Sequence, residues 1–233
     1  MKTITSIFVA VALAGISAQA QNIISWSYAN GLAVSGTAGV VPASNWNLTQ
    51  EPGSADLLSN SGASTGTTLT LAGGFGAWGI GGAAQDPDGT YNSAIFSGYY
   101  NSLGSTLTLG SIPFSSYDIY VYISSDGDGR TGTVSDGTTT FSFSTDARAK
   151  VDAHDNFAFA LTTDTGAGNP SADYAIFSGL TGGSQTFTIA NTSDGMGFAG
   201  IQIVSTVPEP STLALVGLGG FGLCVWRRRM QTA

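Results

Sequence analysis

Two Asp-Gly loops carry residue types that could bind a cation. Residues 86–89 read Asp-Pro-Asp-Gly, and residues 126–129 read Asp-Gly-Asp-Gly. Carboxylate and loop carbonyl oxygens are the ligands that Ca²⁺ prefers, so Asp126 and Asp128 are candidate calcium ligands. Neither loop completes an EF-hand, because no glutamate stands at the bidentate position. Asp-Gly pairs also form ordinary turns, and this alternative stays open, so calcium is the one cofactor that we consider.

Aromatic side chains in glycine-rich or polar contexts could bind a sugar ring. Trp78 lies in the glycine-rich run 73–79, and Tyr99 and Tyr100 precede Asn101. Flat rings beside polar side chains suit a carbohydrate, so Trp78, Tyr99 and Tyr100 are candidate ligand residues. The alternative is that these rings pack in the core. The wider set of candidate rings also includes Trp26, Trp46, Tyr91 and Tyr117.

Groups suited to catalysis are sparse. His154 is the only histidine and Cys224 the only cysteine, and no Gly-x-Ser-x-Gly pattern surrounds a serine. A hydrolase needs a nucleophile, a base and an orienting group within reach, so we expect no enzyme. The alternative is a glycan-active enzyme, whose two carboxylates would stand about 5–9.5 Å apart. The spacing of the aspartates does not single out such a pair.

The charge balance disfavours a polyanionic partner. Charged residues make up 9% of the chain. Residues 21–207 hold three basic side chains (Arg130, Arg148 and Lys150) against 14 acidic ones, all of the 15 except Glu209. The resulting formal charge of −11 repels a phosphate backbone, so we expect no nucleic-acid partner.

Apolar residues in this segment recur with a period of two rather than 3.6. A period of two places alternate side chains on opposite faces of a strand, so each run predicts a strand with one apolar face. The alternating runs are 106–109, 120–123, 140–143, 157–161, 186–189 and 200–203. Roughly nine to eleven short strands, separated by Gly and Asp turns, predict an all-β domain at 21–206. Of the sandwich and the barrel, we expect a single β-sandwich, without amphipathic helices.

Two segments resemble the galactose-binding-like jelly roll, which malectin-like domains share. They are residues 116–122 and the final run 198–204. The resemblance implies a jelly-roll-like sandwich and assigns no binding residue. An internal repeat is also visible, because Ala-Ile-Phe-Ser-Gly occurs at 94–98 and again at 175–179. It marks either equivalent strands in two halves of a sandwich or the general similarity of Thr/Gly-rich strands.

The N-terminus has the three parts of a secretory signal peptide. Lys2 supplies a positive start, residues 7–14 are apolar, and Ala18 and Ala20 make an A-x-A cleavage site. The secretion machinery recognises such a helical segment, here residues 1–20, and it is then removed. We therefore expect an extracytoplasmic mature protein that begins at Gln21.

The C-terminal segment 207–233 combines a proline pair, an apolar run and a basic end. As a helix the run 212–226 would span about 22 Å, short of the ~30 Å hydrocarbon core. We still expect a transmembrane-type helix there, with a positive-inside stop at Arg227, Arg228 and Arg229. An ordinary single-span anchor is the alternative, and it leaves the proline pair unexplained.

A Pro-Glu-Pro tripeptide, a glycine-rich apolar span and an arginine cluster, in this order, resemble the PEP-CTERM protein-sorting domain. The same tail also carries the label of an ice-binding protein C-terminal domain. The resemblance implies recognition by an exosortase, a membrane transpeptidase-like enzyme, with processing near Pro208, Glu209 and Pro210. It also implies a Gram-negative-type envelope protein of a kind that accompanies exopolysaccharide production. It implies nothing about the domain in front of the tail.

We therefore predict an exosortase-sorted envelope or exopolysaccharide-matrix protein with a structural or adhesive role and no catalysis. Its precursor would be anchored in the inner membrane. The mature protein would lie in the cell envelope, on the outer surface or in the extracellular matrix. The first alternative is a carbohydrate-binding module, and the second is a glycan-active enzyme that uses an Asp pair.

Overall fold

Alternation of apolar and hydroxyl-bearing residues builds the strands of this protein. In β4 (Ser64–Ala72), Leu69 and Leu71 are buried while Thr68 and Thr70 are exposed. Residues of these types suit a pleated surface with one buried face. The computed structural model describes residues 22–28, 30, 32–49, 53–81, 85–191 and 195–207.

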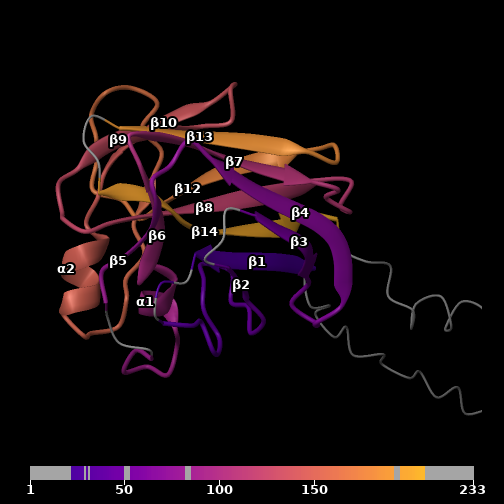
Figure 1. Cartoon of the computed structure of the whole chain (residues 1–233), viewed down its shortest axis with the longest axis horizontal. Coiled ribbons are helices and arrows are strands. Elements are labelled where there is room, and N and C mark those ends of the chain that lie inside the picture. The colour runs from indigo at the N-terminus through magenta and orange to yellow at the C-terminus, as the bar shows by residue number, and fades with distance from the viewer. Residues whose placement is uncertain are drawn as a thin grey trace, which may run out of the picture. The chain divides into compact units, whose positions relative to one another are not determined.

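The strands form two sheets, which confirms the predicted all-β sandwich (Figure 1). The six-stranded sheet has the order β10 (Thr140–Ser144), β9 (Thr131–Ser135), β13 (Gln185–Asn191), β7 (Gly104–Gly110), β4 and β3 (Gly53–Leu58). The eight-stranded sheet has the order β11 (Leu161–Thr162), β12 (Tyr174–Leu180), β8 (Tyr117–Ser125), β14 (Met196–Ser205), β1 (Ile23–Tyr28) and β2 (Asn47–Thr49). Beside this path, β6 (Gly98–Ser102) pairs with β14, and β5 (Gly76–Gly79) pairs with β6 at the edge.

The two sheets differ in strand direction. All pairs of the six-stranded sheet are antiparallel. The eight-stranded sheet is mixed, because β2 runs parallel to β1 and β11 runs parallel to β12. In its centre β14 pairs with β8 along its whole length, with a register shift between Phe198 and Gly200. The strands described here do not close into a barrel, and the jelly-roll resemblance stays a prediction.

Apolar side chains from both sheets meet in an inter-sheet core. Its fully buried members include Trp26, Leu107, Phe187 and Phe198. Rings contribute much of the packing, and the centroids of Phe177 and Phe187 lie 4.9 Å apart. Each such side chain stabilises the fold by about 1.5–3 kcal/mol through its removal from water.

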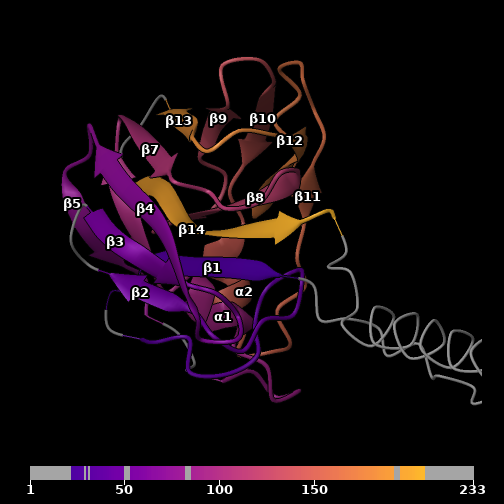
Figure 2. The same ribbon diagram turned by 90° about the vertical axis from the view of Figure 1, so that its right-hand side faces the viewer.

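A second apolar cluster, the outer core, lies on the other face of the eight-stranded sheet. The helices α1 (Asn92–Ile95) and α2 (Ala147–Asp152), together with loop residues such as Val34 and Trp46, cover this face. Figure 2 shows both helices on the side of β1 and β14 that faces away from the six-stranded sheet. The expectation of one apolar face per strand is therefore wrong for β14, whose ten residues are all buried.

A buried glutamine fastens one of these covering loops. The Gln202 side chain accepts hydrogen bonds from the Tyr122 hydroxyl at 2.5 Å and from the Val41 backbone N–H at 3.3 Å. Its amide donates to the Val41 carbonyl at 2.7 Å and to the Ser25 hydroxyl at 3.2 Å. Burial raises the pKa of the Tyr122 phenol well above its usual value, so this hydroxyl keeps its proton.

The strand predicted at 157–161 is largely absent, because only Leu161 enters a strand. Phe157 instead stacks on Phe96 in the outer core, with ring centroids 4.4 Å apart. The Ala160 backbone N–H donates to a side chain, that of Asp173, rather than to a neighbouring strand. The two short helices were not predicted either, since each is too short to show a helical period.

No helix among the described residues has the length and apolar character needed to cross a bilayer. The helices predicted within residues 1–20 and 212–226 lie outside the described residues.

Candidate functional site

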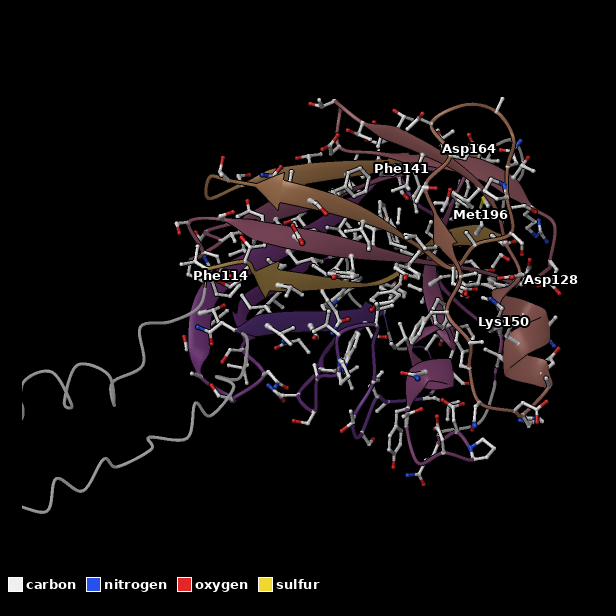
Figure 3. The ribbon with its side chains drawn as sticks, turned by 180° about the vertical axis from the view of Figure 1, so that it is seen from behind. Phe114, Asp128, Phe141, Lys150, Asp164 and Met196 are labelled. Atoms are coloured by element: carbon white, nitrogen blue, oxygen red, sulfur yellow. The ribbon has the colours of Figure 1, made fainter. Side chains whose placement is uncertain are left out.

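Three ionisable side chains meet beside α2, close to the start of β12. Lys150 lies on the sheet side of α2 (Figure 3), and its Nζ is 2.6 Å from Oδ2 of Asp173 and 3.0 Å from Oδ2 of Asp146. Asp146 is the N-cap residue of α2, and Asp173 immediately precedes β12. One turn of α2 therefore places Lys150 beside Asp146, and the segment that leads into β12 adds Asp173.

Further hydrogen bonds hold both carboxyl groups of this cluster. The Ala160 backbone N–H donates to Oδ2 of Asp173 at 2.8 Å, and the Ser171 hydroxyl donates to Oδ2 of Asp146 at 2.5 Å. The two aspartate side chains also hydrogen-bond to each other. The Oδ1 atoms of both residues are buried.

The two carboxyl groups differ in acidity. Asp173 is fully buried, and this burial, together with the hydrogen bond that its protonated carboxyl group donates to Asp146, raises its pKa to about 8. Burial also acts to raise the pKa of Asp146, but hydrogen bonds from Asp173, Ser171 and Lys150 outweigh it, and the pKa is lowered. At neutral pH the pair therefore holds one proton, on Asp173, and one negative charge, on Asp146.

Sequence reasoning missed this cluster. Two signals could have found it: Lys150 is the one lysine within residues 21–207, and Asp146 precedes it by four residues, a spacing that pairs side chains on a helix. The third member, Asp173, comes from a distant part of the chain. The cluster contains the Asp pair with one raised pKa that a glycan-active enzyme requires. However, these carboxyl groups touch, whereas glycoside hydrolysis uses a separation of about 5–9.5 Å.

The structure places the three aromatic residues that we took as sugar ligands on the paired strands β5 and β6, with Trp78 opposite Tyr99, but it exposes only Trp78 of the three. Trp78 is 51% exposed on edge strand β5, and the preceding Phe75 is 69% exposed. Tyr99 and Tyr100 are only 0% and 6% exposed, which agrees with the alternative that these two rings pack in the core. Both faces of β6 are covered, because Tyr99 packs in the outer core and Tyr100 in the inter-sheet core. Of the wider set, Trp26, Trp46 and Tyr117 are also buried, and Tyr91 is half-buried.

The two Asp-Gly loops are engaged in contacts within the chain. Oδ1 of Asp126 lies 2.5 Å from Nη2 of Arg130, and Oδ1 of Asp128 accepts a hydrogen bond from the Ala149 backbone N–H at 3.3 Å. In the other loop, buried Asp86 accepts hydrogen bonds from Thr90 and Ser93. Over the described ranges, no three His, Cys, Asp or Glu side chains are grouped so as to hold a metal ion. The calcium site stays a prediction.

A hydroxyl-rich surface covers the outer face of the six-stranded sheet. We call it the threonine face, and it consists of Thr68, Thr70, Thr106, Thr108, Thr186 and Thr188 on the adjacent strands β4, β7 and β13. The register aligns Thr70, Thr108 and Thr186 in one row across the three strands. The Thr108 and Thr186 hydroxyl oxygens lie 3.3 Å apart, within hydrogen-bond distance. None of these strands contains a charged residue.

The threonine face continues onto the neighbouring strand β9, where Thr188 pairs with Ser135 and Ala190 pairs with Thr133. An open hollow of about 340 Å³ lies at this end of the sheet. It is lined by Thr131, Gly132, Thr133, Asn169, Ala190 and Asn191. The hollow is shallow and uncharged, so the whole face presents hydroxyl, amide and small apolar groups.

The signal cleavage residues, the Pro-Glu-Pro motif and the arginine triplet all lie outside the described residues. A family model described as the PEP-CTERM protein-sorting motif matches residues 206–229, which contain the proline pair, the apolar run and the arginines. The predicted sorting motif is therefore confirmed. A comparison with curated proteins gives no significant match.

Proposed function

Because the chain carries a PEP-CTERM sorting motif, which indicates an exosortase-targeted extracytoplasmic protein, we propose that its folded domain is a structural or adhesive component of the cell envelope or exopolysaccharide matrix. The domain needs no catalysis of its own for this role. In the proposed pathway the secretion machinery exports the precursor, the tail holds it in the inner membrane, and the exosortase processes it near Glu209.

The observation that carries the proposed role is the threonine face. Its rows of hydroxyl groups can donate and accept hydrogen bonds, as the hydroxyls of a sugar polymer do. The absence of charged residues on β4, β7 and β13 favours an uncharged polymer over a charged one. We propose that an uncharged stretch of exopolysaccharide lies on this face.

The sorting step predicts a specific mass for the mature protein. Protein purified from its own envelope or medium is expected to begin at Gln21 and end near Pro208, with any additional mass identifying an attached group. Replacing Pro208, Glu209 and Pro210 with alanine is expected to leave the tail, including Trp226, on the protein. A wild-type mass that includes Trp226 and the arginine triplet would contradict processing and would leave a plain membrane anchor.

Binding to the matrix is expected to depend on the row Thr70, Thr108 and Thr186. Changing all three to valine keeps side-chain shape and β propensity but removes three hydroxyls. If each takes part in one hydrogen bond, affinity for exopolysaccharide from the producing cells should fall by about tenfold or more in co-sedimentation. The control changes three exposed loop threonines, at 163, 165 and 181, to valine and should bind normally. Equal binding by both triple variants would exclude the threonine face.

A carbohydrate-binding module remains the second candidate, and the exposure of Trp78 favours it. The same co-sedimentation assay separates the two candidates. Loss of binding in Trp78→Ala, with normal binding by the threonine-face variant, would assign the sugar site to β5 instead.

A further inference from the structure

The side chains of Lys150 and Asp173 lie in contact, with the carboxyl group of Asp146 against both. An amine, a buried carboxyl group and a second carboxyl group in this arrangement contain all the parts of an amide-forming reaction. We propose that Lys150 and Asp173 form an intramolecular isopeptide bond between Nζ and Cγ, with Asp146 as the proton-transfer residue.

Asp173 is the electrophile. A carboxyl group can lose its hydroxyl only when it is protonated, and the buried position of Asp173, with its raised pKa of about 8, keeps it protonated at neutral pH. Its Oδ2 accepts the backbone N–H of Ala160 at 2.8 Å, and this donor stabilises the negative charge that develops on Oδ2 during attack. Its Oδ1 is buried and is the oxygen that leaves.

Lys150 is the nucleophile, and its amine must be neutral to attack. Oδ2 of Asp146 lies 3.0 Å from Nζ and is therefore placed to take a proton from the ammonium group. The Ser171 hydroxyl donates to the same oxygen and orients the carboxylate. Nζ also lies 5.5 Å from the centroid of the Phe157 ring, which covers this side of the cluster with apolar surface. Because the fold holds the amine and the carboxyl group in contact, their reaction is effectively unimolecular and avoids the entropy cost of bringing two free reactants together.

The reaction balances without any co-reactant. One ammonium proton passes to Asp146, the Nζ lone pair forms the bond to Cγ, and the negative charge collects on Oδ2. The second amine proton goes to the leaving Oδ1 hydroxyl, the bond from Cγ to Oδ1 breaks, and water departs. The product is a neutral amide with one hydrogen on nitrogen, and Asp146 ends protonated. The net charge of the cluster is zero before and after.

The bond would tie α2 to the start of β12 and close the loop between residues 150 and 173. A cross-link stabilises a fold mainly by restricting the unfolded chain. This chain has one cysteine, so an intrachain disulfide cannot supply such a constraint. An amide bond does so independently of redox conditions, which suits an exported domain.

The test is the intact mass of the mature protein, purified after processing in its own host. The expected mass is lower than the processed composition by one water molecule, and trypsin is expected not to cleave after Lys150. Tandem mass spectrometry should place the loss on a link between residues 150 and 173. A measured mass with no loss of water, together with tryptic cleavage after Lys150, would overturn the proposal.

Variants separate the proposed bond from other losses of water, such as succinimide formation at Asp-Gly pairs. Lys150→Arg keeps the positive charge and removes the nucleophile. Its measured mass should therefore equal the mass calculated from its sequence, with no water lost. Asp146→Asn keeps both reactants and should link at least tenfold more slowly, because the proton-transfer residue is lost. The control Asp152→Asn, in the same helix, should still lose water. A water loss that persists in Lys150→Arg would show that the bond is not the one proposed.

Stability gives a second readout for a folded variant. The melting temperature of Lys150→Arg is expected to lie about 10 °C below that of the linked protein. If the unlinked and linked fractions of the wild-type protein have the same melting temperature, the cross-link has no role in stability, and that part of the proposal fails.

Discussion

Gly197→Ala is expected to lower the free energy of unfolding by about 3 kcal/mol or more. A loss of this magnitude is a large part of the stability of a typical domain, so a smaller yield of folded protein is also expected. Gly197 lies in β14 opposite Asn101 of β6. A Cβ atom at this position would lie 1.8 Å from the backbone oxygen of Tyr100 and 2.7 Å from its carbonyl carbon. Because the obstacle is backbone, a rotamer change cannot relieve it, and β6 would have to separate from β14.

The matched control for this prediction is Gly183→Ala, in the turn between β12 and β13. An added Cβ there meets no atom within 4 Å. Its stability is expected to stay unchanged or to rise slightly, because alanine restricts the unfolded chain. Urea unfolding followed by tryptophan fluorescence measures both variants. Equal stability of the two would show that β6 does not approach β14 as closely as the structure places it.

Gln202→Leu is expected to cost about 2–4 kcal/mol of unfolding free energy, although the side chain stays similar in size. Leucine would leave the partly buried N–H and carbonyl of Val41 and the buried Tyr122 hydroxyl without this partner. Each lost partner costs more than an ordinary surface hydrogen bond, because water cannot replace it.

A suitable control is Gln85→Leu, at an exposed glutamine whose amide donates to the Gly89 carbonyl at 3.0 Å. We expect it to change stability by less than about 0.5 kcal/mol. Hydrogen exchange gives a more local measurement. In Gln202→Leu the amides of the 38–43 loop should exchange faster than those of the inter-sheet core, because the network holds this loop on the sheet. Uniform destabilisation with an unchanged loop would count against this role of Gln202.

The two proposed features of the domain occupy opposite sides of the sandwich. The threonine face belongs to the six-stranded sheet, whereas Lys150 and Asp173 lie by α2 and β12 in the eight-stranded layer. A polymer on the threonine face would leave the proposed cross-link uncovered. The isopeptide and polysaccharide tests therefore probe separate parts of the molecule. If one proposal fails its test, the other proposal is unaffected.

Much of the sandwich could be predicted from local sequence. The runs at 106–109, 120–123, 140–143, 186–189 and 200–203 all lie in strands, because a period of two determines which side chains share a face. The sorting motif was also readable, since its order of prolines, apolar span and arginines is a linear signal that needs no folded context.

Prediction from local sequence failed where segments that are distant along the chain cover the second face of the eight-stranded sheet. The pentapeptide Ala-Ile-Phe-Ser-Gly enters α1 at 94–95 and a turn before β6 in its first copy, whereas its second copy lies within β12. The repeat therefore does not mark equivalent strands. The same residues adopt the structure that their neighbours in space allow, because intrinsic preference over five residues is weaker than tertiary packing.

The sequence by itself determined the strand character of the domain, its low charge and its sorting signal, because each of these is written in adjacent or alternating residues. Only the tertiary structure decided that Tyr99 and Tyr100 are buried, since this depends on layers formed by segments far from β6. It also aligned the threonines of three strands in one row and placed Asp173 against Lys150. Strand register and helix docking set those distances, and neither is encoded in the spacing of residues along the chain.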